Sequence, residues 1–372
     1  MKRPAIFLRL ALIALATLGI FFAVPLLFPP PFTAEFIPNA FGGRQSDAYA
    51  INEHGQVVGS AYTASGETYA FLWSKETGMT DLGNLGGKFS YAYAINDHRQ
   101  IVGWAYTASS EIHAFLWSKK TGMTDLGTLG GNASYANAIN NHGQIVGAAG
   151  TASGERRAFL WSKKTSMIDL GNLGGEYSFA SAINDHGQIV GEARTASGEE
   201  HAFLWSKETG MIDLGTLGGK TSSADAINNH GQIVGRADTA SGEEHAFLWS
   251  KKTGMIDLGT LGGEISGASA INNHGQIVGW AETISGENHA FFWSKQTGMI
   301  DLGTLGGKYS DAYAINNQGQ IIGSAGFPPP WWVRAWIWSA KKLDLPEKYF
   351  PAKEKQSGTS KAVIWTVPPP EK

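Results

Sequence analysis

The stretch AINNHGQIVGRADTASGEEHAFLWSKKTGMIDLGTLGGEISGAS, residues 226–269, is one of seven close copies of a 44-residue unit. The tripeptide AIN opens every copy, and its alanine recurs every 44 residues at Ala50, Ala94, Ala138, Ala182, Ala226, Ala270 and Ala314. A fixed period of this length is typical of repeat proteins, in which each unit buries its apolar faces against its neighbours. The secondary structure of one unit therefore determines the fold of the whole array.

Each unit predicts four short strands separated by turns. In the third copy the strand-like runs cover residues 134–140, 143–151, 157–163 and 167–173. Such runs, with turn signals at a spacing of about 8–12 residues, indicate an all-β fold. No segment after residue 35 keeps a helical period over three turns. The chain contains 48 glycines, which supply the positive-φ positions that tight turns need.

We predict an all-β, seven-bladed β-propeller. Four meandering strands and about 40–50 residues per unit match propeller blades, and closing a ring buries both faces of every sheet. An open β-solenoid is the alternative, but its coils need fewer residues than this unit has. Residues 37–43 resemble the end of a unit, and residues 343–345 and 362–366 resemble MIDL and AFLWS. We therefore expect the domain to cover residues 36–372, with strands from both termini completing one blade. The sequence does not decide which terminal strand takes which position in that blade.

An apolar segment precedes the repeats. Lys2, Arg3 and Arg9 are followed by residues 10–28, which carry no charge. At about 1.5 Å per residue, a helix of this length nearly spans a bilayer core of about 30 Å, and basic residues before it stay cytoplasmic. We expect residues 1–28 to be an uncleaved anchor helix, with a cleaved signal peptide as the alternative, and residues 29–35 to be a proline-rich linker. The repeats then lie outside the cytoplasmic membrane, either anchored or secreted.

The composition excludes several classes of function. Charged residues make up 16% of the chain and the formal net charge is −3, which argues against a nucleic-acid partner. The absence of cysteine excludes disulfides, thiolate metal sites and cysteine nucleophiles. We expect no cofactor and a monomeric ring.

The phrases HAFLWS, MIDLGTLGG and AINNHGQIVG together resemble the HAF family of bacterial extracellular repeats. The resemblance covers about residues 37–345 and implies a surface or secreted location, without implying a reaction. The seventh unit departs from the pattern, because Gln318 replaces the turn histidine and residues 327–332, FPPPWW, replace the TASGE turn.

Ten histidines and a repeated aspartate invite hypotheses of metal binding or catalysis. The turn histidines each belong to a different unit, so a ring holds them apart, and Tyr69 and Arg157 replace the histidine before AF in two copies. We therefore predict no metal site. One identical aspartate per unit is a structural hydrogen-bond acceptor in this interpretation, and the repeated tryptophans are packing anchors.

Departures from the repeat are better candidates for a binding site, because packing does not dictate them. Two positions of the second strand vary most. The first holds Ser60, Trp104, Ala148, Glu192, Arg236, Trp280 and Ser324. The second, two residues later and on the same strand face, holds Tyr62, Tyr106, Gly150, Arg194, Asp238, Glu282 and Gly326. We select as ligand- or partner-binding candidates Trp104, Tyr106, Glu192, Arg194, Arg236, Asp238, Trp280 and Glu282.

The loop of the seventh unit adds Trp331 and Trp332 to these candidates. Its three prolines cannot donate to a strand ladder, so residues 327–332 are expected to leave the sheet. Exposed tryptophan is enriched at binding hot spots and at membrane interfaces. Contact with a partner or lipid is one interpretation, and capping of the closing blade is the other.

A rigid ring with variable positions on a repeated frame suits a non-enzymatic binding or interaction module, with a surface glycan or a protein as its partner. The alternative is a carbohydrate-active hydrolase or lyase, since propellers also carry such chemistry. An enzyme should concentrate unique polar residues in one or two units, whereas these copies differ by scattered single changes.

Overall fold

The computed structural model describes residues 33–37, 40–304, 307–326 and 360–366. These residues form the strands β1 to β28, and no helix among them is long and apolar enough to cross a membrane. The all-β prediction is confirmed. The expected anchor (residues 1–28) lies outside the described residues, as do Trp331 and Trp332.

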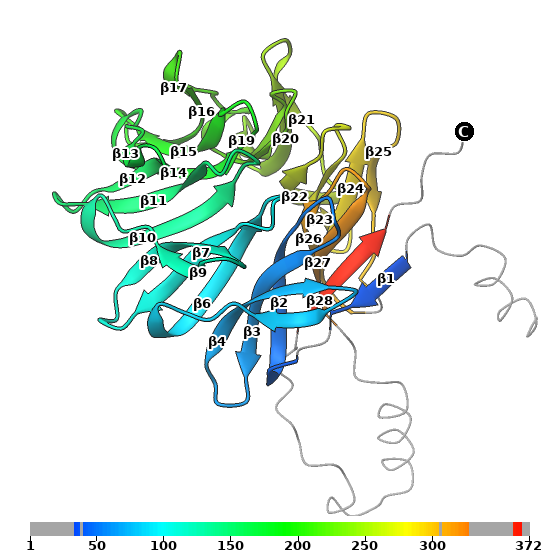
Figure 1. The fold of residues 1–372 in the computed structure, drawn as a ribbon. Coiled ribbons are helices and arrows are strands. Elements are labelled where there is room, and N and C mark those ends of the chain that lie inside the picture. The colour runs from blue at the N-terminus through cyan, green and yellow to red at the C-terminus, as the bar shows by residue number, and fades with distance from the viewer. Residues whose placement is uncertain (1–32, 38–39, 305–306, 327–359, 367–372) are drawn as a thin grey trace, which may run out of the picture.

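The strands follow one another in groups of four that repeat with the sequence (Figure 1). The first two groups are β2 (Gly42–Ile51), β3 (Val57–Thr63), β4 (Thr68–Ser74), β5 (Gly78–Asp81), β6 (Gly86–Ile95), β7 (Ile101–Thr107), β8 (Ile112–Ser118) and β9 (Gly122–Asp125). The next two are β10 (Gly130–Ile139), β11 (Ile145–Thr151), β12 (Arg156–Ser162), β13 (Ser166–Asp169), β14 (Gly174–Ile183), β15 (Ile189–Thr195), β16 (Glu200–Ser206) and β17 (Gly210–Asp213). Two more are β18 (Gly218–Ile227), β19 (Ile233–Thr239), β20 (Glu244–Ser250), β21 (Gly254–Asp257), β22 (Gly262–Ile271), β23 (Ile277–Thr283), β24 (Asn288–Ser294) and β25 (Gly298–Asp301).

Each group is an antiparallel meander, for example in the order β18-β19-β20-β21. The first strand of each group contacts the first strands of the neighbouring groups, so these strands form the inner wall and the short fourth strands lie outermost. The sheets follow one another radially around an axis, as blades do in a β-propeller (Figure 1). We use the word blade for each group of four strands.

The closing sheet joins the two ends of the chain. Its order is β26 (Ser310–Ile315), β27 (Gln320–Gly326), β28 (Ser360–Thr366) and β1 (Thr33–Phe36). Trp365 pairs with Ile321 in the same register in which Trp293 pairs with Ile277. Residues 360–366 therefore take the third position and residues 33–36 the fourth, so that β1 begins three residues before the boundary expected at residue 36. The repeat-like residues 334–345 lie outside the described residues.

Two closed rings of hydrogen bonds connect the blades at one end of the inner strands. The buried asparagine of each AIN donates its Nδ2 to the carbonyl of the asparagine one repeat later, from Asn52 to Asn96 and onward, and Asn316 donates back to Asn52. In the second ring, the following backbone N–H donates to the side chain one repeat later, and Asn317 donates back to Glu53. Both rings pass through all seven AIN copies, so the chain is fastened into a circle.

Adjacent blades pack through small and branched side chains. Val190 and Ala202 of one blade pack with Ala224, Ile233 and Phe247 of the next, and all five side chains are shielded from solvent. The same set of residue types recurs between the other blades. Burial of each fully enclosed large apolar side chain contributes about 1.5–3 kcal/mol, so these interfaces are the main source of stability.

Glycine is required at one repeated place and favoured at another. A Cβ on Gly103 would lie 1.9 Å from the carbonyl oxygen of Tyr91, so no larger residue fits this strand position. Gly143 occupies the AIN turn with φ at 73°, and Arg99 holds the same place in the second copy with φ at 60°. The positive φ expected at this turn is confirmed, including its strained arginine.

Candidate functional site

The eight candidates on second strands lie on β7, β15, β19 and β23, four different blades. None of the eight is fully buried. They alternate with glycine and alanine, such as Gly103 and Ala105, which have buried positions on the opposite face. The candidates are therefore accessible side chains on a tightly packed frame.

Trp104 is the centre of an aromatic cluster. It stacks on Tyr91 with ring centroids 4.2 Å apart, and it contacts Tyr106 and Tyr135 edge-on at 6.1 and 5.9 Å. Tyr91 lies on β6 and Tyr135 on β10, so the cluster extends across two blades. The guanidinium of Arg156 lies 5.2 Å from the centre of the Tyr135 ring. Such a surface offers aromatic faces and edges to a ligand.

The charged candidates in the next blades already have partners. Glu192 accepts a hydrogen bond of 2.9 Å from the hydroxyl of Tyr177. Arg194 donates to Glu200 over 3.0 Å. Because these contacts are local, Glu192 and Arg194 do not form one continuous charged group with the aromatic cluster.

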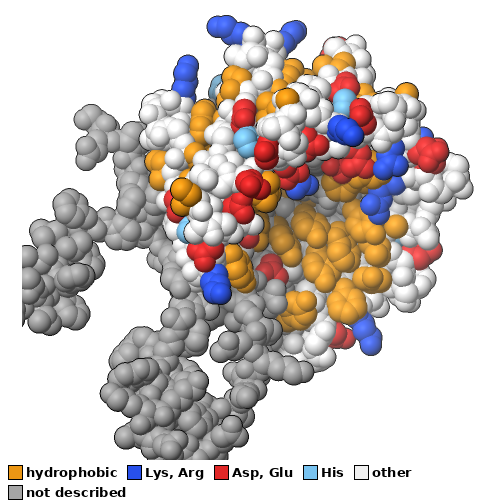
Figure 2. Space-filling view, turned by 180° about the vertical axis from the view of Figure 1, so that it is seen from behind, with side chains coloured by type: hydrophobic (Ala, Val, Ile, Leu, Met, Phe, Trp, Pro, Cys, Tyr) orange, Lys and Arg blue, Asp and Glu red, His pale blue; other side chains and the backbone are white. Residues whose placement is uncertain are grey.

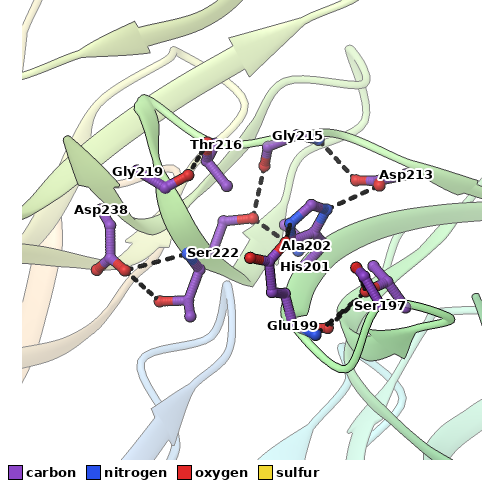
Figure 3. Close-up of polar contacts among 12 residues, drawn as sticks. Ser197, Glu199, His201, Ala202, Asp213, Gly215, Thr216, Gly219, Ser222 and Asp238 are labelled. Atoms are coloured by element: carbon purple, nitrogen blue, oxygen red, sulfur yellow. Dashed lines mark hydrogen bonds and ion pairs between the residues drawn. The ribbon is translucent and has the colours of Figure 1, made fainter. Parts of the chain in front are cut away.

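In the next blade the charged candidates Arg236 and Asp238 also have partners within their own blade. Asp238 accepts hydrogen bonds of 3.0 and 2.8 Å from the backbone and hydroxyl of Thr221 (Figure 3). Arg236 has a looser partner, since its Nε lies 3.7 Å from Glu244 and 44% of its side chain is exposed. Arg236 is thus the charged candidate with the most freedom to meet a ligand.

Trp280 and Glu282 lie on β23, apart from the aromatic cluster on β6, β7 and β10. The indole of Trp280 covers Gly267, because a Cβ there would lie 3.0 Å from the indole ring. Glu282 accepts a hydrogen bond of 2.7 Å from the backbone N–H of Glu264. Beside them, Ile284 is 91% exposed at the tip of the turn, where the preceding copies have alanine.

Sequence reasoning missed the variable positions outside the second strand. In the first six copies, seven positions of the unit hold at least four different amino acids, which in the first copy are Arg44, Gln45, Asp47, Tyr49, Ser60, Tyr62 and Thr68. Only the positions of Ser60 and Tyr62 were selected from the sequence. Comparing all 44 columns of the repeat, instead of one strand, would have found the others. We name these seven positions, in every copy, the variable belt.

Strand pairing makes the belt continuous. Within a blade, Tyr91 pairs with Trp104, and Tyr106 pairs with Ile112. Between blades, Ile112 pairs in parallel with Ala133 of the next inner strand. The belt therefore extends from the end of the blades opposite to the AIN turns along the inner strands, where its innermost position directly precedes the alanine of AIN.

The innermost belt positions line the inner wall of the ring. Tyr49 and Tyr93, on neighbouring inner strands, have ring centroids 4.9 Å apart. Asp225 on β18 occupies the equivalent place in the fifth copy. Burial raises the pKa of the Asp225 carboxyl to about 7, an effect that the guanidinium of Arg236 opposes and that Glu192 and Glu244 reinforce. A carboxyl that titrates near neutral pH is a marker of a functional site.

The opposite end of the ring is nearly invariant. It forms an open pocket of about 200 Å³ lined by the isoleucine of each AIN, by the asparagine of the first six copies and by the residue that follows AIN. That following residue is Glu53, Asp97 or Asp185 in three copies and asparagine in the rest. Sequence variation among the copies is thus concentrated in the belt, and the turns at this end change little.

The repeated aspartates and histidines have structural partners. The Asp213 carboxylate accepts a hydrogen bond from the backbone N–H of Gly215 over 2.7 Å and contacts Nδ1 of His201 at 2.8 Å (Figure 3). The equivalent aspartates make the same turn contact in the other copies. Within the described ranges, no group of three or more histidine, aspartate or glutamate side chains is arranged to hold a metal ion.

One face of the molecule is hollowed at its middle. Figure 2 shows hydrophobic side chains gathered in this hollow, with acidic and basic side chains around its rim. A concave surface with an apolar floor and a polar rim is the usual form of a ligand site.

Comparisons with known proteins support the fold alone. No family model and no curated protein matches the chain. The β-propeller domain of the trilobed protease from Pyrococcus furiosus matches with a TM-score of 0.52 and 10% identity, over 75% of this chain and 91% of that one. A puromycin-hydrolyzing peptidase from Mycobacterium tuberculosis matches with 0.54 and 11%, over 77% of this chain and 49% of that one. TolB from Acinetobacter baumannii matches with 0.46 and 12%, over 71% and 64%. The chain thus spans about half the length of the peptidase and less than two thirds of TolB, and what the likeness shows is a β-propeller.

Proposed function

We propose that this chain is a non-enzymatic binding module built on a seven-bladed β-propeller, and that the variable belt is its binding surface. The observation that carries the proposal is the concentration of sequence variation in the seven belt positions of a frame that is otherwise repeated almost unchanged. The two closed hydrogen-bond rings through seven AIN copies support the blade count.

The belt has the composition of a recognition surface. The Trp104 cluster supplies a rigid aromatic surface, and Arg236 and Asp225 supply ionisable groups elsewhere on the belt. A surface glycan or a peptide offers the apolar faces and hydrogen-bonding groups that such a surface takes. The peptidase and protease neighbours do not favour an enzyme here, because their likeness is at the level of the fold.

A screen of the full-length chain, in detergent, against glycan and peptide arrays tests the proposal. The matched variant carries Trp104→Ala and Tyr106→Gly, which are the residues of the same positions in the third copy, Ala148 and Gly150. We expect the variant to keep the melting temperature and to lose binding by tenfold or more. Equal binding by both proteins, or a hit that a Lys120→Ala variant in an outer turn abolishes, contradicts the proposal.

We also propose that the module acts outside the cytoplasmic membrane. The basic residues before the uncharged segment 10–28 and the resemblance to HAF repeats support this location. Trp331 and Trp332 remain proposed contacts to a partner or to lipid. N-terminal sequencing of the exported protein tests the anchor, because a soluble product that begins near residues 30–36 contradicts it.

A further inference from the structure

The aromatic rings around Trp104 form a connected surface that extends over the first three blades. Trp104 stacks on Tyr91 with ring centroids 4.2 Å apart and meets Tyr135, on the inner strand of the third blade, edge-on at 5.9 Å. Its indole also lies beside the hydroxyl of Tyr93, whose ring contacts that of Tyr49 at 4.9 Å. None of these rings is fully buried. We name this surface the aromatic crescent, which consists of Tyr49, Phe89, Tyr91, Tyr93, Trp104, Tyr106 and Tyr135.

The crescent offers mainly ring surface to a ligand. The Tyr49 hydroxyl lies 3.3 Å from Ser60 Oγ, and the Tyr93 hydroxyl has the Trp104 indole as its polar neighbour. A peptide brings backbone N–H and C=O groups that need hydrogen-bond partners wherever they lose water. A pyranose ring instead stacks through its C–H face, which electron-rich aromatic faces attract, and keeps its equatorial hydroxyls in water. The crescent therefore favours a saccharide over a peptide.

An exposed basic side chain lies at the edge of the crescent. The guanidinium of Arg156 is 5.2 Å from the centre of the Tyr135 ring. The adjacent Arg157 pairs with Glu155 at 2.9 Å, whereas Arg156 forms no ion pair with any residue that the structure describes. The crescent is thus bordered by a positive charge that has no carboxylate partner in the described part of the chain.

The carboxylates of the next blade already have donors of their own. Glu192 accepts a hydrogen bond of 2.9 Å from the Tyr177 hydroxyl, and Glu200 accepts one of 3.0 Å from Arg194. Arg156 can therefore pair with an anionic group of a ligand, and a guanidinium binds a planar carboxylate through two parallel hydrogen bonds. A stacking surface beside such a guanidinium fits a sugar ring that carries a carboxylate.

We propose that the aromatic crescent binds an acidic saccharide, in which the C–H face of a pyranose ring stacks on the crescent and the carboxylate of a uronic acid pairs with Arg156. This inference rests on the proposed function and names the class of its ligand. A neutral saccharide would stack without using Arg156. An acidic peptide would pair with Arg156 without using the ring faces.

The repeat supplies a substitution for each half of the site. At the position of Arg156, the other five of the first six copies hold Thr68, Ile112, Glu200, Glu244 and Asn288. Arg156→Asn therefore places a residue that the sixth copy carries, and Trp104→Ala places one that the third copy carries. Lys120→Asn, an equal loss of charge in an exposed outer turn, is the control.

Calorimetric titration of the full-length chain at pH 7 tests the proposal. The probes are hexamers of β-1,4-glucuronate, α-1,4-galacturonate and β-1,4-mannuronate, each with its methyl ester, and hexaglutamate. We expect at least one acidic hexamer to bind and its uncharged ester to bind about fivefold more weakly. Trp104→Ala should weaken binding of both forms about tenfold. Arg156→Asn should lower only the affinity for the acid, to that of the ester, and Lys120→Asn should change neither.

Four results overturn the inference: no acidic hexamer binds, the ester binds as tightly as the acid, Arg156→Asn keeps the preference for the acid, or hexaglutamate binds as tightly as the saccharides. If array ligands still depend on Trp104 in any of these cases, the proposed function stands and only the acidic saccharide fails. If nothing binds in either experiment, both fail.

Discussion

Asp225 makes the stability of the protein depend on pH in a direction opposite to that of most aspartates. Its pKa is about 7 in the folded chain, against 3.8 for an unperturbed carboxyl. Between these values the folded state holds more protons than the unfolded state, so stability falls as pH rises through this window. Below about pH 4 the carboxyl is protonated in both states, and the effect vanishes.

The substitution Asp225→Asn removes this titration with little change of shape. We expect the variant to match the parent chain at pH 4 and to be more stable by about 2–4 kcal/mol at pH 8, where the parent carries a half-buried negative charge. Urea unfolding at several pH values measures the difference, with Glu208→Gln as the control. A parent chain that is equally stable at pH 5 and pH 8 would contradict this account of Asp225.

The buried asparagine of each AIN forms hydrogen bonds both within its own turn and to the next blade. Asn184 accepts from the backbone N–H groups of His186 and Gln188, and its amide donates to the Gln188 side chain and to the Asn228 carbonyl. It therefore shapes its own turn and fastens the next blade.

Removing these contacts should be costly. We expect Asn184→Ala to lower the free energy of unfolding by about 2–4 kcal/mol, because the Asn228 carbonyl and two backbone donors lose their partner in a buried place. Asn172→Thr is the control. Asn172 accepts a hydrogen bond from the backbone N–H of Gly174, and in another copy Thr128 accepts the equivalent bond from the backbone N–H of Gly130. Chemical denaturation should show the control within about 0.5 kcal/mol of the parent.

The number and order of strands in one blade could be predicted from the sequence, because each turn carries its own signal, but two boundaries could not. In the third copy the inner strand begins at Gly130, before the predicted start at residue 134, and the fourth strand ends at Asp169, before the predicted end at residue 173. Arg99 keeps the turn that glycine makes in the other copies. The closing blade was less predictable. Residues 334–339, AWIWS with its preceding arginine, resemble the third strand as well as residues 362–366 do, and the repeat pattern does not choose between them.

Deletions at the C-terminus test which segment closes the ring. Removing residues 360–372 should lower the melting temperature strongly, because β27 and β1 both lose the strand between them and expose unpaired backbone. Removing only residues 367–372, beyond β28, should have little effect. If both deletions melt at the same temperature as the parent chain, residues 360–366 do not hold the third position.

The binding surface could be predicted only in part, and the reason is physical. Variation along one strand is visible in the sequence, and it pointed to Trp104 and its equivalents. Burial raises the pKa of Asp225, Arg236 opposes this effect and Glu192 adds to it, and these groups belong to different strands that come together only in the folded chain. Local partners such as Tyr177 for Glu192 were likewise invisible, because the register between inner and second strands sets them.

The ring presents two ends with different roles. The AIN turns at one end are nearly uniform and fasten the blades, whereas the variable belt, which extends from the inner wall to the other end, carries most of the differences among copies. The exposed isoleucines Ile168, Ile212 and Ile256 lie on outermost strands and recur with the repeat, so they belong to the frame in this account.

Hydroxyl-radical footprinting of the full-length chain, with and without a ligand captured by the array screen, tests most directly that the variable belt is the binding surface. The account predicts lower oxidation of Tyr91, Trp104 and Tyr106 in the complex, and unchanged oxidation of Trp161 and Met167, which lie away from the belt on β12 and β13. Protection confined to the AIN turns or to the outermost strands, with the belt unchanged, would contradict it.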